Sequence, residues 1–296
     1  MKFLDLRTDF AFKKVFGSRD SKPRLISFLN SVIEFSDDNA ITDLEIVDPY
    51  NIPKLEGMKD TFVDVKAVLS DETTVIIEMQ VLSHDGFEKR VLYNAAKNYS
   101  IQLDKGEQYQ LLKPVIALTI VNFTMFDDND ELINTYKLIN KKHFTTYSDD
   151  IELVFIELTK FTKTEAQCQD IRDNWIYFLK NAGDLTMVPN NMPEQVRSAY
   201  DISNEASMSK AELELQHKKK EFISIQINAL SLAQRKGETK GKIEGKIEGK
   251  IEGKMEGIEL VATNLLLNTN MSVEEVTQLT GLSNEDVLAL QAKLKK

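Results

Sequence analysis

The chain has 296 residues, of which 42% are hydrophobic and 28% are charged. Enough apolar material is present for a core, which excludes a disordered chain or a collagen-like fibre. Acidic residues outnumber basic ones by 47 to 37, so any nucleic-acid contact needs a local positive patch rather than bulk charge. The single cysteine, Cys168, excludes an intramolecular disulfide, and no apolar run reaches the ~18 residues of a membrane span. We therefore expect a cytoplasmic protein without a membrane contact.

The first part of the chain predicts two helices and then three strands. Thr8 can cap a helix that Gly17 ends, and Pro23 stands at a favoured first position of a second helix. Strand-like segments follow at 41–48, 61–69 and 74–82. The polar residues 70–73 join the last two segments as a hairpin.

Helical and strand-like segments alternate in the rest of the N-terminal part. We expect helices at 87–104, 165–181 and 193–206, and strands at 113–123, 131–139 and 151–158. The segment 113–123 is almost continuously apolar, which is typical of a buried strand. This order predicts an α/β fold with a mixed central sheet flanked by helices.

Beyond about residue 206 the sequence becomes repetitive and helical. Residues 208–236 predict a long amphipathic helix, and Gly-Lys-Ile-Glu then repeats from Gly241 to Glu256 with one Ile-to-Met change. Each glycine costs about 1 kcal/mol against alanine, and lysine stacks over lysine at i,i+4, so the repeat alone is a marginal helix. It either packs against another copy or serves as a solvated spacer, and both alternatives stay open here.

The C-terminal tail contains two short predicted helices. Capping boxes begin at Ser272 and Ser283, and Gly281 separates the helices. The layout resembles a helix-turn-helix, but the second helix begins with Glu285 and Asp286, which repel phosphate. A packing or self-association module is therefore favoured over DNA reading. We divide the chain into 1–206, 207–257 and 258–296, and expect a homo-oligomer through the C-terminal helical region.

The hairpin carries the most informative polar residues. Glu78 and Gln80 are two residues apart in an otherwise apolar strand and so share one face. A turn at 70–73 places Asp64 opposite or nearly opposite Glu78, with the Cβ atoms about 5 Å apart if the two are paired. Two carboxylates that close repel one another unless a proton or a cation such as Mg²⁺ intervenes. The alternative is a surface hairpin whose polar residues face water.

Several sequence blocks, taken in order, resemble one known family. The blocks are Thr8–Gly17, Phe62–Val65, Ile77–Val81, Arg90–Tyr93 and the strand that begins at Lys113. Over about residues 1–200 they resemble the Rpn family of recombination-promoting nucleases and transposases. That family belongs to the PD-(D/E)XK nuclease superfamily. The resemblance implies a core of the restriction-endonuclease type, to which this chain adds a helical C-terminal extension.

The resemblance also implies a catalytic site. Asp64 and Glu78 would bind a divalent metal, Mg²⁺ or Mn²⁺, and would act together with Gln80. Gln80 stands where the superfamily motif has lysine, so either its amide orients the attacking water or Lys66 supplies the missing charge. Supporting roles are predicted for Asp9, Lys66, Arg90 and Tyr93, with Lys97 as a further candidate for phosphate contact.

The implied activity is metal-dependent hydrolysis of DNA phosphodiester bonds by an endonuclease of the recombination-promoting or transposase-related type. The alternative is a weak or inactive nuclease fold that acts as an oligomeric scaffold for DNA or a protein partner. Loss of the motif lysine and the acidic composition favour the scaffold. Retention of Asp64 and Glu78 favours the enzyme.

Overall fold

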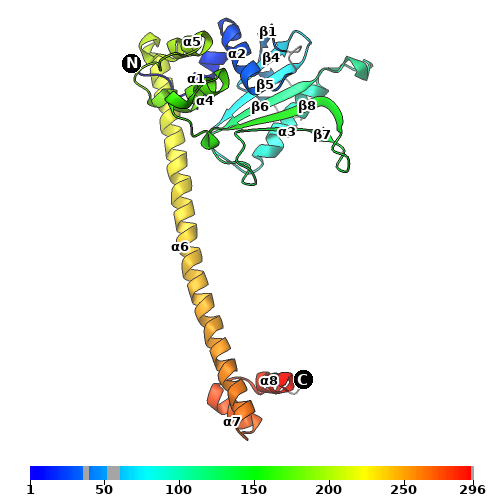
Figure 1. The fold of residues 1–296 in the computed structure, drawn as a ribbon, viewed down its shortest axis with the longest axis vertical. Coiled ribbons are helices and arrows are strands. Elements are labelled where there is room, and N and C mark those ends of the chain that lie inside the picture. The colour runs from blue at the N-terminus through cyan, green and yellow to red at the C-terminus, as the bar shows by residue number, and fades with distance from the viewer. Residues whose placement is uncertain (36–39, 52–60, 295–296) are drawn as a thin grey trace. The chain divides into compact units, whose positions relative to one another are not determined.

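The computed structural model describes residues 1–35, 40–51 and 61–294 (Figure 1). Internal contacts divide the chain into two units, Met1–Ile227 and Asn228–Lys296. The domain boundaries at 206 and 257 stay predictions. Within the described ranges, no helix combines the length and the apolar character needed to cross a bilayer.

The first unit contains a mixed six-stranded sheet in the order β1-β4-β5-β6-β8-β7. Its strands are β1 (Leu44–Val47), β4 (Val65–Leu69), β5 (Thr74–Gln80), β6 (Val115–Val121), β7 (Ile133–Ile139) and β8 (Thr146–Glu157). β6 pairs in parallel with β5 and β8, and the other neighbours are antiparallel. A separate pair consists of β2 (Tyr50–Asn51) and β3 (Thr61–Phe62). The mixed α/β sheet is thus confirmed.

Helices cover both faces of this sheet (Figure 1). One face packs against α1 (Asp9–Phe16), α2 (Lys22–Val32), α4 (Ile171–Asn181) and α5 (Glu194–Ser203). The main core lies there and includes Phe12, Phe28 and Trp175. The other face packs against α3 (Phe87–Ser100) through Phe87 and Val91. Because β6 lies between two layers, all of its residues are buried, as its apolar sequence predicts.

Local sequence signals explain most of the element boundaries. The Thr8 hydroxyl accepts the Ala11 N–H at 3.3 Å, and a Cβ at Gly17 would lie 2.7 Å from the Lys13 carbonyl oxygen. The predicted helix 165–181 is too long, because the Asp170 carboxylate accepts the Asp173 N–H and caps α4 at its start. The strand predicted at 151–158 begins earlier, since β8 extends back to Thr146 in its pairing with β7.

The continuous strand predicted at 61–69 is wrong, because the chain is interrupted at Asp64. Residues i and i+2 of a regular strand share one face, yet Val63 packs in the α3 layer and Val65 in the main core. Val65 faces Ile77, and the Asp64 N–H also donates to the Ile77 carbonyl at 3.0 Å. Two residues therefore oppose one, which is a β-bulge, a device that re-aims a side chain.

The C-terminal helices carry a small core of their own. α6 spans Lys210–Asn268 and is helical through the whole repeat. α7 (Val273–Thr280) and α8 (Asn284–Leu294) follow, with Gly281 between them at a φ of 75°. Four buried residues from the three helices make this core: Ala262, Val276, Leu282 and Val287. α7 and α8 thus pack against the end of α6, and the role of the tail stays a prediction.

Candidate active site

Asp64 is held at the start of β4 by one backbone group and one cation. Its Oδ2 accepts the Met79 N–H at 2.8 Å, and its Oδ1 lies 3.3 Å from the Lys13 ammonium of α1. The side chain is only 12% exposed. The bulge brings about this arrangement, because it turns the Asp64 carboxylate toward the backbone of β5.

Glu78 and Gln80 lie on β5 and share a partner on α3. Arg90 forms an ion pair with Glu78 through Nη2, and the same atom donates to Gln80 Oε1 at 3.0 Å. Gln80 Nε2 donates to the Leu82 carbonyl at 2.8 Å, so both ends of its amide are oriented. The predicted common face of Glu78 and Gln80 is confirmed, and it faces α3.

The two carboxylates are electrostatically coupled. Burial raises the pKa of Asp64, and the Met79 N–H and the Lys13 ammonium oppose that rise. Burial also raises the pKa of Glu78, which Arg90 opposes and the charge of Asp64 reinforces. The site therefore holds two partly desolvated acids that repel one another, with one cation against each.

A second layer of contacts holds α1, which carries Lys13. The Asp9 carboxylate accepts the Phe10 N–H at 2.9 Å and lies 3.0 Å from the Lys219 ammonium of α6. The Thr8 hydroxyl donates to Gln216 Oε1 at 2.8 Å. Asp9 also contributes to the raised pKa of Asp64 through its like charge. The first turns of α6 therefore belong to the support of the site.

The remaining predicted residues lie in different surroundings. Burial lowers the pKa of Lys66, and the acid that acts against this shift is Asp48. Tyr93 is exposed on α3, whereas Lys97 is only 3% exposed. A role of Lys66 as a substitute for the motif lysine stays a prediction.

Lys13 is the residue that sequence reasoning missed. It lies within the block Thr8–Gly17, four residues after Asp9, so both belong to one face of α1. That spacing was the available signal, but only the fold brings this face of the helix against Asp64. β5 lacks the motif lysine, but the ammonium of Lys13 reaches the Asp64 carboxylate from α1.

The carboxylate pair fits a divalent metal with few protein ligands. Among the described residues, no group of three or more His, Cys, Asp and Glu side chains could hold a metal ion. Mg²⁺ commonly binds through one or two carboxylates and keeps several waters, so the chemistry of Asp64 and Glu78 is compatible with such a site. Their raised pKa values agree with a site that favours added positive charge.

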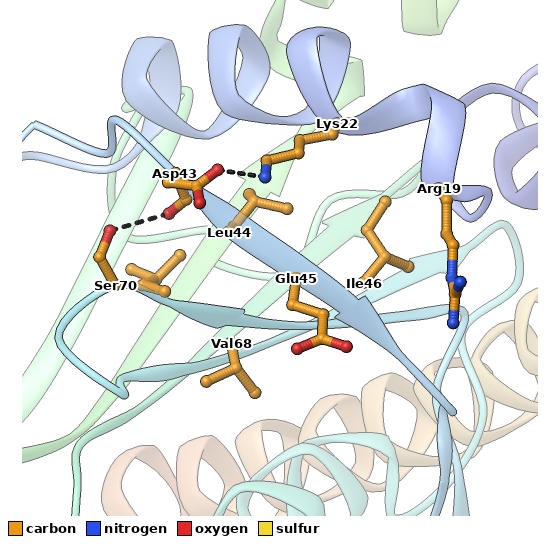
Figure 2. A pocket seen from close by; sticks show the side chains of 9 residues that line it. Arg19, Lys22, Asp43, Leu44, Glu45, Ile46, Val68 and Ser70 are labelled. Carbon is orange, nitrogen blue, oxygen red and sulfur yellow. Dashed lines mark hydrogen bonds and ion pairs between the residues drawn. The ribbon is translucent and has the colours of Figure 1, made fainter.

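A separate pocket of about 510 Å³ lies along β1 and does not include these residues (Figure 2). Lys22 pairs there with Asp43, and the Ser70 hydroxyl donates to the Asp43 carbonyl at 3.2 Å. Glu45, on β1, is an exposed carboxylate in this pocket. It offers a matched control for substitutions of the two site acids.

Comparison with known proteins identifies the family to which the chain belongs. Neither the curated proteins nor the solved structures contain a significant match to the chain. Residues 6–233 match the family model described as PD-(D/E)XK nuclease family transposase. The match covers more than half of the chain and includes α1, the β4–β5 hairpin and α3. The chain therefore belongs to the PD-(D/E)XK nuclease family of transposases.

Proposed function

We propose that this protein is a metal-dependent DNA endonuclease of the recombination-promoting type. Membership of the family supports a nuclease-type function. The observation that carries the finer proposal is that Asp64 and Glu78 are both largely buried acids with raised pKa values, and that the charge of Asp64 contributes to the raised pKa of Glu78. A sheet that needed only stability would gain little from such a pair.

Each residue of the site has a role in this proposal. Asp64 and Glu78 would hold Mg²⁺ or Mn²⁺, which when bound polarises phosphate and lowers the pKa of coordinated water. Lys13 provides an ammonium beside Asp64, where it can stabilise charge that develops on a phosphate oxygen. Gln80 orients Arg90, and the Arg90 guanidinium can bind a non-bridging phosphate oxygen.

Lys13 and Arg90 also supply the local positive patch that an acidic protein needs for DNA. Both side chains are more than a third exposed, while the carboxylates beside them are largely buried. An approaching phosphate therefore meets the cations before it meets the acids. This arrangement supports contact with a nucleic-acid backbone.

Cleavage assays test the proposal. Plasmid and linear DNA are incubated with Mg²⁺, Mn²⁺ or EDTA and with wild type, Asp64→Asn or the control Glu45→Gln. We expect metal-dependent cutting by wild type and Glu45→Gln, and a loss of about 10³-fold in Asp64→Asn, because several kcal/mol of transition-state stabilisation depend on the metal. Equal cutting by Asp64→Asn contradicts the proposal. No cutting by wild type favours the scaffold alternative.

We also propose that the chain forms homo-oligomers through α6 and the tail. Many large apolar side chains of α6 beyond Ile227 are exposed, among them Leu230, Leu232 and Leu260. Truncation after Ile227 tests this, since it keeps the Gln216 and Lys219 contacts to α1. Light scattering should show an oligomer for the full chain and a monomer for the truncated chain. An oligomer of unchanged size after truncation contradicts the proposal.

A further inference from the structure

The Gly-Lys-Ile-Glu repeat forms an exposed helix with an apolar stripe. Ile243, Ile247, Ile251 and Met255 are between 46% and 59% exposed. All residues of the repeat are exposed, and the helix continues without interruption through them. An exposed row of four large apolar side chains on a helix weakened by glycines gains stability only when that row is covered.

Two rows of opposite charge flank this stripe. A lysine precedes each apolar residue and a glutamate follows it. At 100° per residue, the lysines lie along one side of the stripe and the glutamates along the other. The glycines are two residues from the apolar positions and lie on the opposite face of the helix.

The lysines and glutamates of the repeat cannot pair with one another within their own helix. Lysine and glutamate of the repeat are two, six, ten or fourteen residues apart, never three or four, so they do not meet on the helix surface. The described ion pair at this segment joins Glu244 to Lys240, which precedes the repeat, at 3.6 Å. Within the repeat, lysine stacks over lysine and glutamate over glutamate, which is destabilising.

We propose that the repeat pairs with the repeat of a second copy of this chain in parallel orientation. When two such helices face each other through the apolar stripe and run in the same direction, the lysine row of each lies beside the glutamate row of the other. When they run in opposite directions, lysine meets lysine and glutamate meets glutamate. Charges that flank an apolar seam set helix orientation in this way.

The dimensions of the helix fit this pairing. In a parallel pair in register, each lysine lies about 3 Å along the axis from the nearest partner glutamates, at a rise of 1.5 Å per residue. The four-residue period exceeds 3.6, so the stripe drifts by about 40° per repeat, and the two helices stay in contact along it by winding round each other with a right-handed twist. Both copies enter the pair from the same end.

The charges also discriminate against other occupants. The repeat carries equal numbers of lysine and glutamate, and every apolar residue has a glutamate on one side. Phosphate groups of DNA or of a lipid surface would meet the glutamate row as well as the lysine row. A copy of the same segment satisfies both rows. The inference rests on the proposed self-association and is independent of the nuclease activity.

Disulfide cross-linking of the full chain tests the direction. In a Cys168→Ser background, Ile243→Cys and Met255→Cys are oxidised separately and as an equal mixture, with Gly249→Cys, in the glycine row between them, as the control. We expect each of the first two to cross-link with itself, no 243–255 product in the mixture, and no product for Gly249→Cys. The two positions are about 18 Å apart along the axis of one helix, so the products are distinct.

The other outcomes overturn the proposal. A 243–255 product without the self-linked dimers shows an antiparallel pair. A product from Gly249→Cys alone shows that the glycine face is the interface. A wild type that is monomeric in light scattering overturns the proposed self-association as well. The nuclease proposal is tested separately by DNA cleavage, because the site at Asp64 and Glu78 does not require self-association.

Charge reversal gives a second test that contains its own control for folding. One variant replaces the four lysines with glutamate (Lys242, Lys246, Lys250 and Lys254). The other replaces the four glutamates with lysine (Glu244, Glu248, Glu252 and Glu256). We expect the dissociation constant of each variant alone to rise at least about tenfold and an equal mixture to form a heterodimer. Unchanged self-association of both variants overturns the proposal.

Discussion

The carboxylate site and the repeat of α6 use charge in opposite ways. At the site, each acid is largely buried and has its own partner: Met79 and Lys13 hold Asp64, and Arg90 holds Glu78. In the repeat, every charge is exposed and the rows act together. A buried charge without its partner is costly, whereas one exposed charge contributes little. Single substitutions should therefore matter at the site and hardly at all in the repeat.

The two regions also differ in the regularity of their backbone. The repeat keeps one helical conformation over many residues, and the placement of its charges follows from a four-residue period. The site depends on an interruption, because the bulge at Asp64 breaks the alternation of the strand. An irregular backbone conformation costs free energy that the surrounding structure must offset, so such conformations often occur at functional positions.

The largest effect is expected for the two acids together. Glu78→Gln should reduce DNA cleavage about 10³-fold, and the double variant with Asp64→Asn should lose little more, because both side chains serve one metal. Glu248→Gln, a single exposed acid of the repeat, should cleave like wild type. Cleavage rates of the four proteins measure this. Additive losses in the double variant, about 10⁶-fold, would show two independent roles.

Lys13 allows a comparison between neighbouring lysines. Lys13→Met should reduce cleavage by about 10–100-fold, because a donor for the phosphate charge is lost near Asp64. Lys14→Met is the matched control, since Lys14 pairs with Glu212 of α6 instead. Single-turnover cleavage by both variants under saturating Mg²⁺ distinguishes them. Equal losses in both would assign the effect to the packing of α1 rather than to the ammonium of Lys13.

Arg90 supplies the positive charge now beside Glu78. Arg90→Gln should bind Mn²⁺ about tenfold more tightly than wild type, because no guanidinium competes for Glu78, while DNA cleavage falls. Calorimetric titration with Mn²⁺ alone measures the affinity. Lys89→Gln, one residue earlier on α3 and exposed, should leave it unchanged. A weaker affinity in Arg90→Gln would show that Arg90 supports the ligand rather than competes with the metal.

The smallest effect concerns stability without metal. Both site acids have raised pKa values, so the folded state binds protons more tightly than the unfolded state. The free energy of unfolding therefore falls as pH rises from the ordinary pKa of a carboxyl group, which applies to the unfolded chain, through the raised pKa values of the folded state. In EDTA at about pH 7.5, Asp64→Asn should melt ~3 °C above wild type, and the difference should vanish near pH 3. A wild type that melts higher than the variant at neutral pH would contradict the raised pKa.

The sequence alone predicted the parts of the site that follow from alternation and turn chemistry. The tetrad 70–73 set the hairpin, and the register from Val68 opposite Thr74 to Val65 opposite Ile77 is the expected one. The ladder ends there, so the bulge replaces the expected pairing of Asp64 with Glu78. The common face of Glu78 and Gln80 required only a period of two. Thr8 and the cap of α1 followed from local propensity.

The bulge and the two cations required the fold itself. An alternating pattern does not show where a ladder slips, and here the bond from the Met79 N–H to the Asp64 carboxylate accompanies the slip. Lys13 lies on a helix packed on the sheet, so its contact with Asp64 depends on tertiary structure. Gln216 and Lys219 reach α1 from a segment that sequence patterning separated from the N-terminal domain.

The most direct test of the account is Mn²⁺ binding by the full chain in the absence of DNA. Calorimetry compares wild type, Asp64→Asn and Glu45→Gln, all shown to be folded by circular dichroism. The account predicts one site in wild type and Glu45→Gln, and an affinity at least about tenfold weaker in Asp64→Asn. Equal binding by all three proteins would place the metal elsewhere and contradict the assignment of Asp64 and Glu78 as its ligands.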